Sequence, residues 1–273
     1  MNIITRNLFR LLRAGVFHRQ EQVEPMSAWK WGKALDLALL HGVEAETWEG
    51  VKLTESQPTM HLTDHLHRQW EQSAHDTHHQ AAENRHIANP LLARKLTKME
   101  EEAATTPTYA LLHQMVDVAL CLLSADRWVR PLLALGQLLE SDCGRIDRDQ
   151  LQEWTAQLRL QRILQLEDAL LVALLGIDEQ RLPFQLTVTP PRRERMVEEV
   201  AATISATRHQ WQFYTEESDA AGNVQHRIFV HNSNASAMFW QARHSARYMK
   251  YYPSESMATF FTSLAQSLTN IEE

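Results

Sequence analysis

The sequence is poor in the residues that build turns and covalent cross-links. Its 273 residues include two cysteines, eight glycines and nine prolines. Two thiols cannot form a disulfide framework or close a four-ligand zinc site, and so few glycines and prolines disfavour a turn-rich all-β protein. Cys121 and Cys143 are therefore expected to be free thiols in a reducing, cytoplasmic compartment.

Long apolar runs and an excess of basic charge are also missing. No stretch of about 18 uncharged apolar residues occurs, so we expect no transmembrane helix. Arg6, Arg10 and Arg13 interrupt residues 1–17, which excludes the apolar core of a signal peptide. The 27 basic and 34 acidic residues give a net charge of −7, which argues against a general nucleic-acid binder.

The first twenty residues form a basic amphipathic segment. Ile4, Leu8 and Leu11 follow helical spacing among arginines, and no acidic residue occurs before Glu21. Such a helix can lie on a membrane surface, or it can dock its apolar stripe into the core and leave its arginines in water. We favour the docked helix because the segment is short, and we keep peripheral membrane contact through residues 1–20 as the lesser alternative.

Apolar residues recur at helical spacing along most of the chain, which predicts a mainly α protein. We expect a multi-helix bundle of about nine or ten helices with a small β-hairpin near residues 211–231. The expected helices cover residues 29–43, 63–96 with a break at Asn89-Pro90, 111–123, 128–140, 147–158, 160–175, 192–209, 235–252 and 254–268. A polar joint at residues 100–107 separates an N-terminal helical region, 1–102, from a C-terminal helical region with the hairpin, 107–273, and we expect the two to pack as one unit.

Histidine is concentrated in one segment, since seven of the 14 histidines lie between residues 61 and 86. The pairs His61/His65 and His75/His79 have the four-residue spacing that lets two imidazoles on a helix share a metal ion. On a helical wheel these histidines share one face and the apolar residues of the segment lie opposite. We therefore favour a polar, pH-sensitive surface and keep a metal site as the alternative.

A second candidate is the carboxylate pair Asp147 and Asp149. Such pairs hold magnesium in nucleotide-transferring enzymes, where they lie on a strand. Here they open a predicted helix, where acids complement the helix dipole, so we favour capping. Phosphate-binding loops, nucleophile elbows and the common zinc motifs are absent from the sequence, so we predict no catalytic residue and no cofactor.

Three stretches carry a family resemblance. Residues 7–17 (Asn-Leu-Phe-Arg-Leu-Leu-Arg-Ala-Gly-Val-Phe) resemble the N-terminus of the uncharacterised nucleotidyltransferase-like family, the fifth nucleotidyltransferase group. Residues 146–160 and 246–255 are similar to its C-terminal helical part. The resemblance implies that active members carry a mixed sheet between these parts, with a lysine-glycine pair and an aspartate-x-aspartate strand.

The place that would match this sheet, residues 99–107, is too short for it, because even one βαβ unit needs about 30 residues. The chain also contains no Lys-Gly dipeptide. The resemblance therefore implies a shortened member that lacks the catalytic sheet, and no catalytic residue is carried over.

These observations favour a non-catalytic helical scaffold, a pseudoenzyme related to nucleotidyltransferases. Its expected partner is another protein or a second copy of the chain, with no nucleic acid and no cofactor. The alternative is metal-dependent nucleotidyl transfer with the catalytic half supplied by another chain. A second alternative is a histidine-rich metal-binding or pH-responsive module on residues 61–86.

Overall fold

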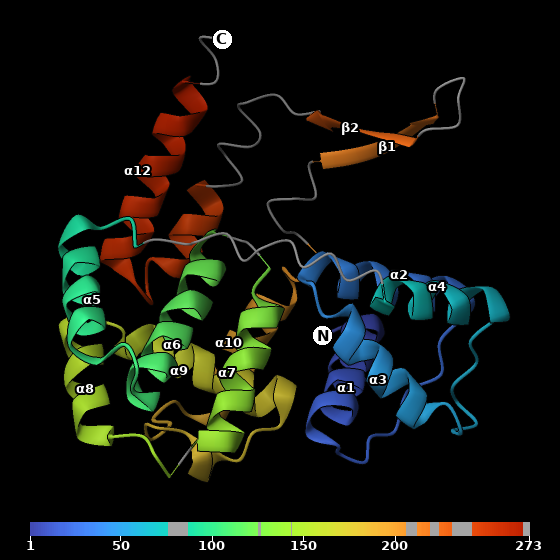
Figure 1. Ribbon diagram of the computed structural model, residues 1–273, viewed down its shortest axis with the longest axis horizontal. Coiled ribbons are helices and arrows are strands. Elements are labelled where there is room, and N and C mark those ends of the chain that lie inside the picture. Colours follow the sequence, from blue (N-terminus) through green and yellow to red (C-terminus); the bar gives the residue numbers. More distant parts are fainter. Residues whose placement is uncertain are drawn as a thin grey trace.

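Helices make up most of the chain in the computed structural model, which confirms the predicted mainly α fold class (Figure 1). The structure describes residues 1–75, 87–124, 127–142, 144–205, 212–218, 224–230 and 242–269. Parts of four predicted elements lie outside the described residues: 76–86 of the helix 63–96, 206–209 of the helix 192–209, 211, 219–223 and 231 of the hairpin, and 235–241 of the helix 235–252; Cys143 lies outside them as well.

The elements follow in this order: α1 (Ile3–Phe17), α2 (Ala28–His41), α3 (Glu44–Thr54), α4 (Asp64–His75), α5 (Pro90–Ala103), α6 (Pro107–Ser124), α7 (Val129–Asp142), α8 (Arg148–Gln157), α9 (Gln161–Leu170), the π-helix η1 (Leu171–Leu175), the 3₁₀ turn η2 (Glu179–Arg181), α10 (Pro190–Ala201), β1 (Gln212–Ser218), β2 (Val224–Val230) and α12 (Pro253–Thr269). Residues 242–248 are also helical. The two strands pair antiparallel, with Gln212 opposite Val230 and Ser218 opposite Val224.

Local chemistry sets several helix ends. The side chain of Asn89 accepts hydrogen bonds from the backbone N–H groups of Leu91 and Leu92, and Pro90 fills the first helical position of α5. This confirms the break predicted at Asn89-Pro90. Gly42 ends α2 and Gly176 ends η1, both with a positive φ of about 65° that only glycine adopts freely.

The predicted polar joint is shorter than expected. The acidic residues 100–102 lie inside α5, which continues to Ala103. Their side chains face solvent, while Met99 and Ala103 are buried and hold this last turn against the core. The break between α5 and α6 is therefore confined to residues 104–106.

Helix α1 confirms the docked alternative for the N-terminal segment. Leu8, Phe9, Leu11 and Leu12 are completely buried. Its arginines are not simply solvated, which corrects that part of the prediction. Arg6 and Arg10 form ion pairs with Glu24, and Arg13 pairs with Glu21, all through the segment that follows the helix.

Helix α3 lies beside α1 and was not predicted from the sequence. The contact is so close that it depends on two glycines: a Cβ on Gly50 would lie 2.0 Å from the carbonyl oxygen of Leu11. A Cβ on Gly15 would lie 2.3 Å from the carbonyl oxygen of Glu46. The backbones of the two helices therefore touch directly, and any side chain at either position would force them apart.

Helices α1 to α4 lie together on the right of Figure 1, and α5, α6 and α8 lie on the left. Several hydrogen bonds between residues far apart in the sequence hold these helices and α12 together. Arg13 donates to the carbonyl oxygen of Leu174 at 2.8 Å, and Arg19 donates to that of Gly176, so α1 closes the end of the π-helix. Asn89 donates its backbone N–H to the carboxylate of Glu255 on α12 at 3.1 Å.

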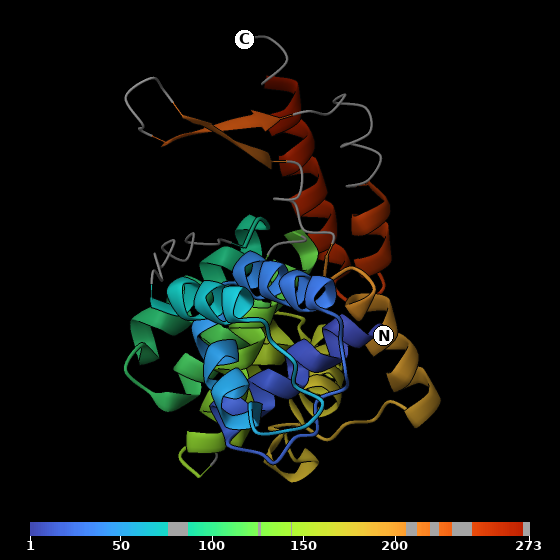
Figure 2. The ribbon, with the colours of Figure 1, turned by 90° about the vertical axis from the view of Figure 1, so that its right-hand side faces the viewer.

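The C-terminal part of α12 projects away from the other helices. In both ribbon views it rises beyond the ends of α5 and α6 (Figures 1 and 2). Within the described residues, no helix combines the length and the apolarity that a membrane crossing requires.

The α1–α3 contact gives the first prediction. Changing Gly50 to Ala should lower the free energy of unfolding by about 1–3 kcal/mol or more, because the added Cβ overlaps the backbone of α1. The control is Gly144→Ala, because nothing lies within 4 Å of a Cβ added there. Urea denaturation of the two variants and the wild type measures the difference. Equal midpoints for all three would show that the helices do not cross this closely.

Candidate functional site

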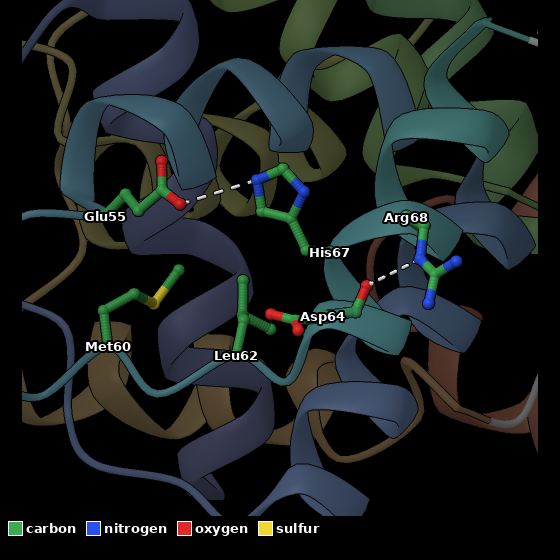
Figure 3. A pocket seen from close by; sticks show the side chains of 6 residues that line it. All are labelled: Glu55, Met60, Leu62, Asp64, His67 and Arg68. Atoms are coloured by element: carbon green, nitrogen blue, oxygen red, sulfur yellow. Dashed lines mark hydrogen bonds and ion pairs between the residues drawn. The ribbon is translucent and has the colours of Figure 1, made fainter.

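An open pocket of about 360 Å³ lies where α3 ends and α4 begins (Figure 3). It is lined by Glu55, Met60, Leu62, Asp64, His67 and Arg68. Its position follows from the chain path, because the first wall residue caps α3, the next two lie in the connecting loop and the last three lie on the first turns of α4.

The pocket is polar and carries both signs of charge. The imidazole of His67 points toward Glu55, with 3.5 Å between Nε2 and Oε1, and it packs edge-on against Trp48 at 4.9 Å between ring centroids (Figure 3). Arg68 donates to the backbone carbonyl oxygen of Asp64 at 3.2 Å. The wall thus already pairs its imidazole with a carboxylate.

The histidine pair His61/His65 predicted from spacing is not assembled into a site, and half of the pair His75/His79 lies outside the described residues. His61 precedes α4, so His61 and His65 do not share a helix, and that part of the prediction is wrong. His65 and His75 are exposed, and His79 lies outside the described residues. Among the described residues, no group of three or more His, Cys, Asp and Glu side chains is placed to hold a metal ion.

The Asp147 and Asp149 pair acts as expected for capping. Asp147 accepts a hydrogen bond from the backbone N–H of Gln150 at 3.0 Å, and Asp149 lies in the first turn of α8. Both side chains are exposed. The N-cap role of Asp147 is therefore confirmed.

The capping geometry predicts that Asp147→Ala lowers the free energy of unfolding by about 0.5–2 kcal/mol, because one backbone N–H of α8 loses its acceptor. Asp149→Ala should lower the free energy of unfolding by less, about 0.3–1 kcal/mol, because it removes only an interaction with the helix dipole. Thermal unfolding with magnesium and with a chelator measures both. A magnesium-dependent stabilisation of the wild type that Asp147→Ala abolishes would instead assign a metal-ligand role.

Two buried carboxyl groups on α9 were missed by the sequence analysis. Glu167 is 0% exposed and Asp168 is 2% exposed. Within the part of the chain that the structure describes, both carboxyl oxygens of Glu167 and Oδ2 of Asp168 have no hydrogen-bond partner. The only signal in the sequence is two adjacent acids inside the predicted helix 160–175, whose other residues are mostly apolar.

Burial shifts both groups toward their protonated form, because a low-dielectric core penalises a negative charge. It raises the pKa of Asp168 to about 8. It raises the pKa of Glu167 well above its usual range, and the nearby Asp168 and Asp117 carboxyls raise it further. At neutral pH both carboxyls are thus mostly protonated, and they lie inside the bundle directly before the π-helix η1.

This pair predicts a pH dependence. The free energy of unfolding should fall as the pH rises from about 6.5 to 8, because the folded chain keeps protons that unfolded carboxyls have already released. Each group contributes up to about 1.4 kcal/mol per pH unit. His244 does not oppose this slope between pH 6.5 and 8. Burial lowers the pKa of its imidazole to about 4 in the folded chain, and the ordinary value is 6.5, so in this range the imidazole is mostly neutral in both the folded and the unfolded state.

The variant Asp168→Asn should reduce this slope, because an amide cannot release the proton. Glu71→Gln is the control, since Glu71 is an exposed acid on α4. Chemical denaturation at closely spaced pH values gives the slope for each protein. Identical slopes for the wild type and Asp168→Asn would mean that Asp168 is ionised in the folded chain.

An exposed apolar surface lies on α12. Met257 and Phe261 are 47% and 57% exposed, and they are four residues apart on one helix face. Phe260 stacks edge-on with Phe261 at 5.6 Å between ring centroids. We call Met257 and Phe261 the α12 apolar face.

The chain has no significant match among protein-family models, curated proteins or solved structures. The resemblance to nucleotidyltransferases stays a prediction.

Proposed function

We propose that this protein is a non-catalytic helical scaffold that binds a protein partner through the α12 apolar face. The observation that carries the proposal is the exposure of Met257 and Phe261 on a helix that projects from the body (Figures 1 and 2). Adjacent large apolar side chains in water favour association, and aromatic residues at such positions often contribute most of the binding energy.

Hydrogen bonds hold the first turn of α12 to the segment that precedes α5, so the helix has a fixed position from which it can bind a partner. The Glu255 carboxylate is completely buried and accepts hydrogen bonds from the backbone N–H groups of Ala88 and Asn89. With about 100° per residue, Met257 and Phe261 lie about 160° and 120° from Glu255 around the helix. The attachment therefore uses one side of α12 and leaves the other side available.

The nearby body supports the same arrangement. His244 contacts the carbonyl oxygen of Leu122 on α6 at 2.8 Å, and the Tyr252 hydroxyl donates to that of Leu158 at 2.8 Å. Both residues are buried. These bonds fix the segment that leads into α12, so a partner meets a preorganised surface and little ordering entropy is lost on binding.

The proposal is tested by affinity capture from the native host with the wild type and with Phe261→Glu as baits. A partner held by the α12 apolar face should be retained at least about tenfold less by the variant, because a buried charge without a pair opposes binding. The matched control is Leu53→Glu, since Leu53 on α3 is 58% exposed. Equal retention by all three baits would contradict the proposal.

A further inference from the structure

We infer that the partner of the α12 apolar face is a second copy of this chain, bound as an antiparallel pair of α12 helices. The inference rests on the proposed function and adds the identity of the partner to it.

The first argument is charge. Glu255 is the only charged residue of α12, and it is buried by its contacts with Ala88 and Asn89. From residue 256 to residue 270 the sequence contains no Lys, Arg, Asp or Glu. By contrast, half of the twelve positions of α10 are charged. The exposed side of α12 is thus uncharged in a chain that has 27 basic and 34 acidic residues.

An uncharged apolar face selects an uncharged apolar partner. A charged surface docked against it would lose water without gaining an ion pair, which costs free energy. A second α12 supplies a matching surface and adds no like-charge contact between the two net-negative chains. A two-fold axis then repeats every favourable contact, as in most homodimers.

The second argument is the position of α12 on the body. Its N-terminal turn is attached beside Asn89, and its C-terminal half projects away from α5 and α6 (Figures 1 and 2). A parallel pair would bring both bodies to the same end of the helices. An antiparallel pair places the bodies at opposite ends and lets the helix dipoles oppose each other.

The sequence continues the apolar spacing of the α12 apolar face toward the end of the helix, with leucines at positions 264 and 268.

The helix length sets the expected affinity. The seventeen residues of α12 span about 26 Å at a rise of about 1.5 Å per residue. A single helix pair buries less than the roughly 800 Å² per partner of a standard interface, so we expect a dissociation constant in the micromolar range.

Sedimentation equilibrium over about 1–300 µM brackets that affinity. The mass of the wild type should rise with concentration from 31.6 kDa toward twice that value. Phe261→Glu should stay at the monomer mass, and Leu53→Glu should behave as the wild type. Circular dichroism of each variant checks that the helices are retained, and Phe261→Ala provides a second, uncharged test with the same expected loss.

Cross-linking tests the arrangement itself. In a Cys143→Ser background, a mixture of Met257→Cys and Phe261→Cys should form a mixed disulfide-linked dimer under mild oxidation, because an antiparallel two-fold axis midway between the two positions places residue 257 of one copy opposite residue 261 of the other. A mixture of Met257→Cys and Leu53→Cys should not form it, and a dimer that forms equally in both mixtures would overturn the antiparallel pair.

The two proposals fail in different ways. A wild type that stays at the monomer mass throughout overturns the second copy as partner. In that case the proposed function survives if Phe261→Glu still abolishes retention of a different protein, and both fail if it does not.

Discussion

The direct contact between the backbones of α1 and α3 is the constraint on which the rest of the structure depends. Gly15 and Gly50 allow it, since neither position has room for a Cβ. The contact seats α1 so deeply that Arg13 reaches the carbonyl oxygen of Leu174. That carbonyl belongs to the π-helix after α9, where helical hydrogen bonds are left open. A side chain of the first helix thus supplies a hydrogen-bond donor to the end of a helix that lies some 160 residues later in the chain.

Several charged groups among the described residues serve this assembly. Arg6 and Arg10 share Glu24, Asp147 caps α8, and Glu255 caps the turn before α5. Glu167 and Asp168 lie in the core as neutral acids. Helix α12 is different, because its outer side has apolar groups and no charge. The proposed function rests on this contrast, since it assigns the exposed apolar face to contact with another protein.

Sequence reasoning found the features that depend on local chemistry and missed those that depend on packing. The Asp147 cap, the Asn89-Pro90 break and the glycine that ends η1 were predictable because each acts within a few residues. Helix α3 was missed because its buried positions include Gly50 and threonines, which carry no amphipathic signal. The α12 helix was predicted, but its exposed face was not, because exposure depends on where distant helices lie.

Hydrogen exchange at two protein concentrations tests the central claim most directly. If the α12 apolar face binds a second chain, its backbone amides should exchange more slowly at a concentration well above the expected micromolar dissociation constant than at one well below it. The slowing should be confined to α12. Exchange in α12 that is independent of concentration, or slowing that appears only elsewhere in the chain, would contradict the account.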